Sequence, residues 1–197
     1  MLFIALLVIA YLFGSLSSAI IFCKMAGLPD PRSQGSGNPG ATNVLRFGGK
    51  KLAIIVLIGD ALKGAMPVLI ARILGFEGME LGWIAFAAFL GHLFPIYFKF
   101  QGGKGVATAL GVLIILSLPL TLIALIVWIL TAVITRYSSL AALVATLAVS
   151  IACIWLVQPG EQVPILLMNL LLIARHHENI KRLFSGAEGK IGVKKVK

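Results

Sequence analysis

The chain has 197 residues, of which 59% are hydrophobic and only 12% charged, and its mean hydropathy is +1.03. This composition excludes an ordinary soluble domain, in which apolar and polar residues are more evenly balanced. The net charge of +10 suggests an anionic partner, but the basic residues are spread between apolar segments and no nucleic-acid recognition motif is visible. We therefore expect one integral membrane domain and no nucleic-acid partner.

Long apolar segments follow one another along the chain, and runs of about 20 apolar residues are typical of membrane-spanning helices. We expect helices over residues 2–23, 52–74, 81–98, 106–117, 120–134, 140–157 and 163–174. No basic residue precedes the first segment, so we expect it to be retained rather than cleaved as a secretory signal. Cys23 and Cys153 lie in apolar surroundings without CxxC spacing, which indicates neither a disulfide nor a metal site.

The stretch 106–134 raises the question of one crossing or two. As a straight helix it would be about 43 Å long, well beyond the hydrocarbon core of about 30 Å. Pro119 lies near its middle and favours a break there. We therefore expect two short helices in this stretch.

The distribution of lysine and arginine orients these helices, because basic connections favour the cytoplasmic side. Seven crossings with the N-terminus outside place all the basic connections inside, namely 24–51, 99–105, 135–139 and the segment after residue 174. The sequence thus predicts an all-α polytopic membrane protein with about seven transmembrane helices, some of them short, and a cytoplasmic C-terminus. Residues 1–184 would form the single domain, and 185–197 a basic cytoplasmic tail.

A first polar, glycine-rich island interrupts the apolar pattern at 33–46. Glycines let backbone N–H groups converge on an anion, although the same composition is common in ordinary turns. The P-loop spacing GxxxxGK[ST] is absent, so no nucleotide is indicated. The candidate phosphate-binding residues here are Gly35, Ser36, Gly37, Asn38, Gly40, Thr42, Asn43 and Arg46.

A second island contains Gly102, Gly103 and Lys104 and precedes an expected helix. A helix N-terminus favours a bound anion and an ammonium adds a full charge. Alternatively, Lys104 is an interfacial lysine that reaches toward lipid headgroups. His92 is expected about six residues inside the end of segment 81–98, either as a hydrogen-bonded structural group or as a direct participant in a site.

A third island reads Arg175-His176-His177-Glu178-Asn179. If it is helical, Arg175, His176 and Asn179 share one side and His177 turns away. A neutral imidazole can accept a proton near physiological pH. Adjacent histidines diverge and no carboxylate cluster supports them, so we expect no metal and no cofactor.

Two smaller features accompany the islands. Asp60 and Lys63 lie deep in an expected helix at a spacing that allows them to pair, and they are interpreted either as a structural ion pair or as a wall of the site. Ser138 and Ser139 follow Tyr137 on the expected cytoplasmic side. Their hydroxyls are candidates for ligand contact or for helix capping.

These islands resemble the motifs of the bacterial acyl-phosphate-dependent glycerol-3-phosphate acyltransferases, the PlsY family. The matching stretches are GSGNPGATN at 35–43 with Arg46, GHLFP at 91–95 with GGKGVAT at 102–108, and RHHENIKRL at 175–183. GDALKG at 59–64 and Tyr137–Ser139 also resemble that family, and the basic end after Ser185 lies outside the pattern. The resemblance runs from about Gly14 to Leu183 in family order.

The resemblance implies a multi-pass enzyme of the bacterial inner membrane. It would transfer an acyl group from acyl phosphate to the 1-hydroxyl of sn-glycerol 3-phosphate, giving lysophosphatidic acid and phosphate. The acyl phosphate would come from a soluble partner enzyme that makes it from acyl carrier protein, and acyl-CoA would not be used. The lipid bilayer is the other expected partner; the oligomeric state is left open, and a monomer is compatible with the family.

The resemblance also suggests roles for particular residues. Ser36, Arg46 and Lys104, with Asn43 and the first-island amides, would hold the two phosphates. Ser139, His176 and Asn179 would position glycerol 3-phosphate. The expected catalytic residues are Lys104, His176 and Ser36, and the base is either His176 or the phosphate of the donor.

Two rival functions belong to other classes. A carrier or channel for organic phosphates would also have polar breaks in its helices, but the chain has no internal repeat and its islands are expected on one face. A phosphatidyl transferase would require clustered aspartates for a metal, and the sequence has none.

Overall fold

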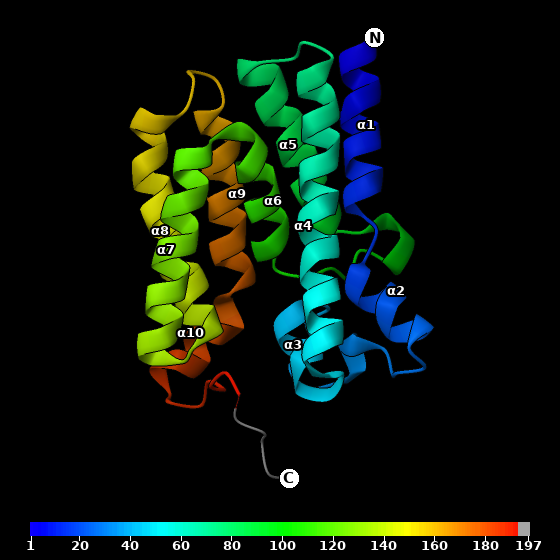
Figure 1. Ribbon diagram of the computed structural model, residues 1–197, viewed down its shortest axis with the longest axis vertical. Helices are drawn as coiled ribbons and strands as arrows, with labels where there is room; N and C mark the ends of the chain where they lie inside the picture. The colour runs from blue at the N-terminus through cyan, green and yellow to red at the C-terminus, as the bar shows by residue number, and fades with distance from the viewer. Residues whose placement is uncertain (193–197) are drawn as a thin grey trace.

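The computed structural model describes residues 1–192, which form a bundle of helices without strands in that range (Figure 1). The α-helices are α1 (Leu2–Gly14), α2 (Ser18–Met25), α3 (Ala41–Phe47), α4 (Gly49–Ile73), α5 (Gly78–Leu93), α6 (Val106–Leu116), α7 (Leu118–Thr135), α8 (Ser138–Leu156), α9 (Gln162–Arg175) and α10 (His177–Phe184). Two short 3₁₀ helices are η1 (Pro31–Ser33) and η2 (Ile96–Phe98). The prediction of an all-α protein is confirmed. Of the predicted basic tail, residues 193–197 lie outside the described part of the chain.

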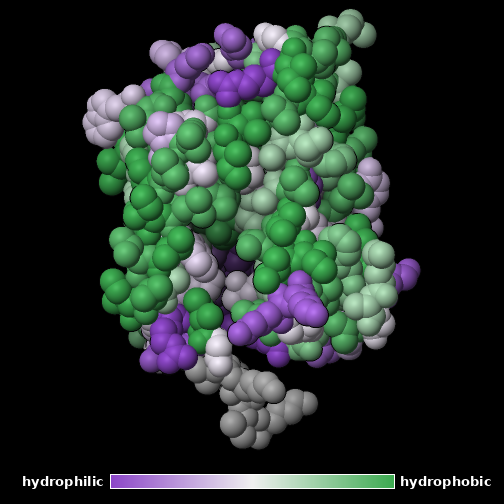
Figure 2. Space-filling model, in the orientation of Figure 1, coloured by the Kyte–Doolittle hydropathy of each residue, from purple (hydrophilic) through white to green (hydrophobic). Residues whose placement is uncertain are grey.

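Within residues 1–192, four helices are long and apolar enough to cross a membrane: α4, α5 together with η2, α7 and α8. The pair α1–α2 makes a fifth candidate, and α6 and α9 are shorter apolar helices. Each of the seven predicted segments therefore contains a helix, while the number that cross the bilayer stays a prediction. Figure 2 shows a hydrophobic belt between two hydrophilic ends of the molecule, as expected for a protein embedded in a bilayer.

The first predicted segment is not one helix, and this expectation was wrong. The chain breaks between Gly14 and Ser18, and α1 and α2 are inclined at 43°. Serine explains the break, because the Ser17 side chain accepts a hydrogen bond from the Ile20 N–H and so caps α2. The Leu16 carbonyl that the break frees accepts a hydrogen bond from Lys63 Nζ at 2.6 Å.

The predicted break within 106–134 is confirmed. Helix α6 ends at Leu116, and α7 begins at Leu118 with Pro119 in its first turn, where proline costs no hydrogen bond. The Ser117 hydroxyl accepts from the Leu120 N–H and caps α7. The two helices are consequently separate elements rather than one overlong helix.

Small residues let the central helices approach closely. A Cβ at Gly14 would lie 2.0 Å from the Ala88 carbonyl oxygen, so α1 and α5 pack backbone to backbone. A Cβ at Gly111 would lie 1.9 Å from the Ala61 carbonyl oxygen, which fixes α6 against α4 in the same way. These crossings fix α5 against α1 and α6 against α4, and the connection 94–105 between α5 and α6 carries the second polar island.

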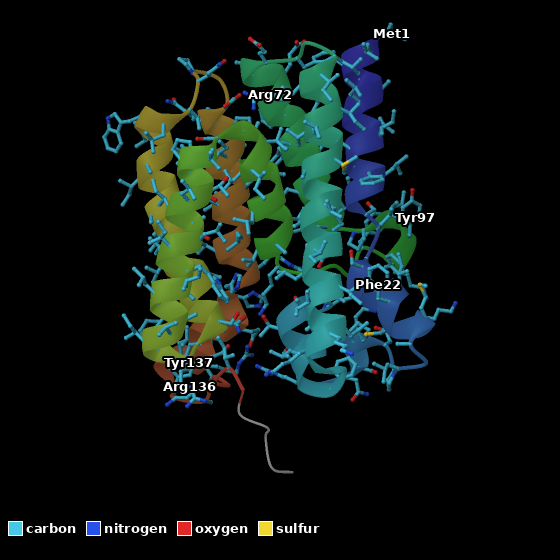
Figure 3. The ribbon with its side chains drawn as sticks, viewed as in Figure 1. Met1, Phe22, Arg72, Tyr97, Arg136 and Tyr137 are labelled. Atoms are coloured by element: carbon cyan, nitrogen blue, oxygen red, sulfur yellow. The ribbon has the colours of Figure 1, made fainter. Side chains whose placement is uncertain are left out.

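The ends of the described chain lie at opposite ends of the molecule. Figure 1 places α1 at one end and α10 at the other, and in Figure 3 Met1 and Arg72 lie at one end while Arg136 and Tyr137 lie at the other. This arrangement agrees with an odd number of crossings. Which end faces the cytoplasm stays a prediction.

Candidate active site

Residues from three distant segments meet beside α10. Lys104 donates a hydrogen bond from Nζ to Asn179 Oδ1. Asn179 Nδ2 and Ser139 Oγ both donate to Glu188 Oε1, each at 2.7 Å. Arg182 Nε donates to Glu188 Oε2, also at 2.7 Å. The structure thus brings together Lys104, Ser139 and Asn179, which the sequence analysis had assigned to one site.

Glu188 was missed by the sequence analysis, which treated the segment after residue 184 as a tail. Nothing in the sequence marks it, because it is an isolated carboxylate in a basic segment. Burial raises the pKa of Glu188, but hydrogen bonds from Ser139, Asn179 and Arg182 outweigh that effect, and the pKa is lowered. The carboxylate is therefore ionised and accepts the hydrogen bond that the Ser139 hydroxyl donates. The lone pairs of Ser139 Oγ are then free to accept from a ligand hydroxyl.

We expect Ser139 and Asn179 to contact a substrate, and we expect Glu188→Ala to raise its KM and to lower kcat/KM at least tenfold. Three donors, on Ser139, Asn179 and Arg182, lose their acceptor, and hydrogen bonds to a charged group contribute about 1.5–3 kcal/mol each. Thermal unfolding of the purified protein would also shift to lower temperature. The matched control is Glu178→Gln, an exposed acid of the same segment. Equal kcat/KM values for the two variants would contradict the role given to Glu188.

His176 lies at the junction of α9 and α10 and is only 2% exposed. The third island is therefore not one continuous helix, because α9 ends at Arg175 and α10 begins at His177. His176 and Asn179 are nevertheless both buried, and His177 points to solvent, as the sequence predicted. His176 Nδ1 lies 2.8 Å from the Leu172 carbonyl oxygen, which can only accept, so Nδ1 carries the proton and Nε2 is an acceptor.

Two site residues have altered basicity. Burial, with the Lys104 charge as a smaller contribution, lowers the pKa of His176 to about 4, so the imidazole is neutral at physiological pH. Burial is also the main reason that the pKa of Lys104 is lowered, to about 8, and Arg182, Arg175 and Arg46 add repulsion. Glu188 opposes that shift. A bound anion would restore the charged form of Lys104, as expected for a cationic anion site.

The first island folds around one buried amide. Asn43 accepts from the Ser36 N–H at 2.9 Å and donates to the carbonyl oxygens of Pro31 at 2.8 Å and Gln34 at 2.9 Å. Asn43 therefore holds the loop together. We had expected its N–H donors to bind a phosphate, whereas both donate within the loop. Gly35 has φ +58 and lies so close to the Asn43 side chain that a Cβ would clash with it.

Two other first-island residues, Thr42 and Arg46, lie next to residues that flank Ser139 and Glu188. Neither bonds directly to the group formed by Lys104, Ser139, Asn179, Arg182 and Glu188, which we call the Lys104 cluster. Thr42 Oγ1 lies 3.2 Å from Ser138 Oγ, beside Ser139. The Arg46 guanidinium lies near Gly189, the residue after Glu188. Ser36 is exposed, and the remaining predicted residues of this loop are Gly37, Asn38 and Gly40, which lead into α3.

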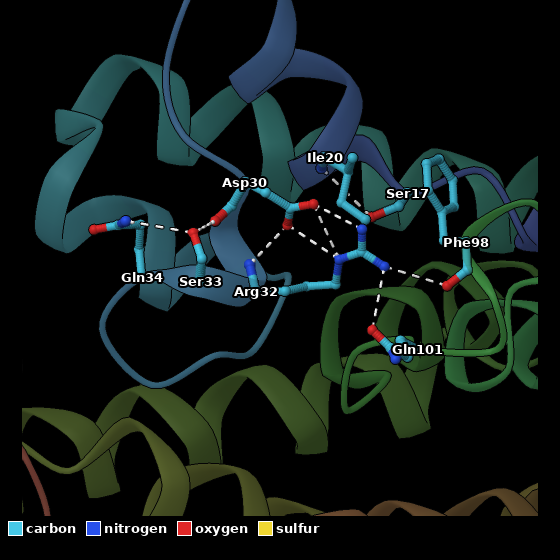
Figure 4. A network of polar contacts seen from close by, with 8 residues as sticks. All are labelled: Ser17, Ile20, Asp30, Arg32, Ser33, Gln34, Phe98 and Gln101. Carbon is cyan, nitrogen blue, oxygen red and sulfur yellow. Dashed lines mark hydrogen bonds and ion pairs between the residues drawn. The ribbon is translucent and has the colours of Figure 1, made fainter.

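Two arginines that the sequence analysis did not select hold the connection 94–105. Figure 4 shows Arg32, paired with Asp30 at 2.7 Å, donating to the Phe98 carbonyl oxygen and the Gln101 side chain. Arg175 donates to the carbonyl oxygens of Gly102 at 2.8 Å and Gly103 at 3.2 Å. Both arginines line an open hollow of about 310 Å³ with Gly37, Pro39, Phe100, Gln101 and Gly102. Arg32, just before the first island, and Arg175 of the third island thus both fasten the connection 94–105.

Asp60, Lys63 and His92 lie beneath that connection. Lys63 Nζ is 2.8 Å from Asp60 Oδ1, so the predicted ion pair is confirmed. His92 occupies the last turn of α5 rather than a position well inside a longer helix, and it is 6% exposed. Its ring lies against the Gly103 backbone, and a direct part of His92 in the site stays a prediction. Among residues 1–192, no group of three or more His, Cys, Asp and Glu side chains could hold a metal ion.

Comparison with known proteins connects this geometry to one family. The family model described as Glycerol-3-phosphate acyltransferase matches residues 4–186. A glycerol-3-phosphate acyltransferase of Vibrio vulnificus (strain YJ016) is 52% identical over 193 residues, covering 98% of this chain and 95% of that protein. One of Shewanella loihica is 52% identical over 192 residues, covering 98% and 94%.

Two solved structures have the same fold. They are crystal structures of PlsY (YgiH), an integral membrane glycerol 3-phosphate acyltransferase, one in the glycerol 3-phosphate form and one in the lysophosphatidic acid form. The first has a TM-score of 0.92 at 39% identity and the second 0.90 at 38%, and each comparison covers 98% of this chain and 96% of that chain. The prediction of a polytopic membrane protein is thereby confirmed. The chain belongs to the glycerol-3-phosphate acyltransferase family of integral membrane enzymes.

Proposed function

We propose that this chain transfers an acyl group from acyl phosphate to the 1-hydroxyl of sn-glycerol 3-phosphate. The observation that carries the proposal is the Lys104 cluster: the half-buried Lys104 ammonium donates to Asn179, and Asn179 shares the Glu188 carboxylate with Ser139. The neutral His176, whose pKa the Lys104 charge helps to lower, adds a hydrogen-bond acceptor at Nε2. Glycerol 3-phosphate offers one anionic group and two hydroxyl donors. The cluster therefore matches its chemistry, and Arg46 and Ser36 of the neighbouring loop extend the positive, donor-rich surface toward a second phosphate.

In the proposed reaction the 1-hydroxyl oxygen attacks the acyl carbonyl carbon and forms an ester bond. The bond from that carbon to the phosphate oxygen breaks, and the phosphate leaves with the electron pair. Lys104 stabilises the negative charge that develops on the carbonyl and the leaving phosphate. Acyl phosphate is already an activated anhydride, so holding the reactants in alignment supplies much of the acceleration.

The proton of the attacking hydroxyl goes to the departing phosphate in this proposal. A His176 imidazole with a pKa of about 4 is a weak base, whereas a phosphate has a pKa near 6. His176 Nε2 then orients the hydroxyl by accepting its hydrogen bond. The reaction products are lysophosphatidic acid and inorganic phosphate.

The proposed setting is the bacterial inner membrane, with seven crossings, the N-terminus outside and the islands facing the cytoplasm. Figure 2 shows a hollow with hydrophilic atoms at its bottom between hydrophobic surfaces. An acyl chain can approach through such an opening while its phosphate stays with the cations. A soluble enzyme that makes acyl phosphate from acyl carrier protein would supply the donor.

The direct test is to incubate the purified protein with palmitoyl phosphate and glycerol 3-phosphate, without CoA and with a metal chelator present. The proposal predicts stoichiometric lysophosphatidic acid and inorganic phosphate. Palmitoyl-CoA in place of palmitoyl phosphate should give no product. Formation of product only from palmitoyl-CoA, or uptake of glycerol 3-phosphate into proteoliposomes without acylation, would contradict it.

The activity should also fall at alkaline pH. The pKa of Lys104 is lowered to about 8, so the free enzyme loses this charge as the pH rises through that value, and kcat/KM should decrease about tenfold per unit above it. Lys104→Arg should lack this decrease, because guanidinium stays protonated. Profiles of kcat/KM between pH 6 and 10 measure the effect. A wild-type profile that is level up to pH 10 would show that Lys104 does not act as a cation.

A further inference from the structure

A buried group of ionisable side chains lies next to the connection 94–105, which contains Lys104. Asp60 and Lys63 on α4 are 2% and 4% exposed, and they form an ion pair at 2.8 Å. His92 on α5 reaches the same carboxylate, with Nδ1 3.8 Å from Asp60 Oδ1. Burying three ionisable side chains is costly, so their presence in the interior calls for a role beyond packing.

His92 links this group to the second island. The Gly103 N–H donates to the His92 carbonyl oxygen at 3.2 Å. A Cβ at Gly103 would lie 2.2 Å from His92 Nε2, so the edge of the imidazole lies directly against the Gly103 backbone. The ring nitrogen Nδ1 faces the Asp60 carboxylate at 3.8 Å, which is beyond hydrogen-bond distance. The Asp60 carboxylate therefore packs against the same ring that lies against Gly103.

Lys63 fixes Asp60 in turn. Its ammonium lies between Asp60 Oδ1 and the Leu16 carbonyl oxygen that the α1–α2 break leaves open. On the opposite side of the connection, Arg175 holds the carbonyl oxygens of Gly102 and Gly103. Gly103 is thus fixed at its N–H and its carbonyl, immediately before Lys104.

We infer that Asp60, with Lys63 and His92, forms a buried support that positions Lys104 against Asn179. These three residues are positioning residues, because none of them reaches the Lys104 cluster itself. The inference rests on the role proposed above for Lys104. It predicts that a charge-balanced removal of the ion pair leaves a folded protein in which the Lys104 ammonium is misplaced.

The first test is the double variant Asp60→Asn with Lys63→Met. It removes both charges together, so no unpaired charge remains buried. We expect a thermal unfolding temperature within a few degrees of wild type, but a kcat/KM for glycerol 3-phosphate at least tenfold lower. Asp60→Glu, which keeps the carboxylate, should recover part of that loss. A purely structural ion pair would instead give a double variant with wild-type kcat/KM, and that result would overturn the inference.

The second test is His92→Phe, which keeps a planar ring but removes Nδ1 and its attraction to Asp60. The expected result is again a folded protein with kcat/KM at least tenfold lower. If the double variant does not fold, the kcat/KM of His92→Phe tests the positioning role in its place. Wild-type kcat/KM in a folded His92→Phe protein would overturn the inference.

A matched control removes another buried polar pair that lies away from the connection. Asn169 Nδ2 donates to Ser150 Oγ at 2.9 Å between α9 and α8. The variant Asn169→Leu with Ser150→Ala should keep wild-type kcat/KM; an equal loss there would show a general effect of polar burial and overturn the specific role of Asp60. Absence of acyl transfer by the wild-type protein would refute the proposed function, whereas an active wild type with unaffected variants refutes only the positioning role.

Discussion

Replacing Lys104 with Met should lower kcat/KM for glycerol 3-phosphate by about 10²–10³-fold, the range found when one preorganised group that stabilises developing charge is removed. Lys104 is the cation that hydrogen-bonds Asn179, and Asn179 shares the Glu188 carboxylate with Ser139. Methionine keeps the length of the side chain but carries no charge and no donor. The substitution therefore removes the electrostatic contribution with little change in volume.

The control for this variant is Lys51→Met, which removes an exposed charge at the start of α4. It should change kcat/KM by less than twofold, because exposed charges are screened by solvent and salt. Steady-state kinetics with palmitoyl phosphate as donor measure both variants. A Lys104→Met enzyme with the activity of Lys51→Met would exclude Lys104 from the reaction.

Gly111→Val should prevent the protein from folding, or destabilise it by more than about 3 kcal/mol. A Cβ at Gly111 would lie 1.9 Å from the Ala61 carbonyl oxygen, and both groups are helix backbone that cannot rotate away. Helices α4 and α6 would have to separate, which would also move the start of α6 and Lys104. The expected results are a low yield of monodisperse protein and a large fall in unfolding temperature.

Ile114→Leu on the same helix is the matched control, because Ile114 is 47% exposed on the apolar surface. Its unfolding temperature should stay within about 2 °C of wild type, as expected for a volume-conserving change outside the core. A Gly111→Val protein that unfolds at the wild-type temperature would show that α4 and α6 do not pack backbone to backbone.

The helical segments were predictable because hydrophobicity alone marks them over about 20 residues. The break at Ser117–Pro119 followed from helix length and from proline. The break at Ser15–Ser17 did not, because it depends on a serine cap and on Lys63, which is far away in sequence and provides the donor for the Leu16 carbonyl. The residues around Leu16 do not reveal a hydrogen bond to a side chain as distant in sequence as Lys63.

The same distinction applies to the site. The meeting of Lys104, Ser139 and Asn179 could be expected, because the motifs that contain them were recognised together. Asn43 was given to a phosphate because its amide is a good donor, yet the fold uses that amide inside the loop. Glu188 could not be selected, since its importance comes only from the position of α10, which places it beside Ser139 and Arg182.

A crystal structure of this chain with glycerol 3-phosphate tests the central claim most directly. The account predicts the ligand beside Lys104 Nζ, with its hydroxyls donating to Ser139 Oγ and His176 Nε2. Glycerol 3-phosphate bound at the end of the molecule that carries Met1 and Arg72, or away from Lys104, would contradict it.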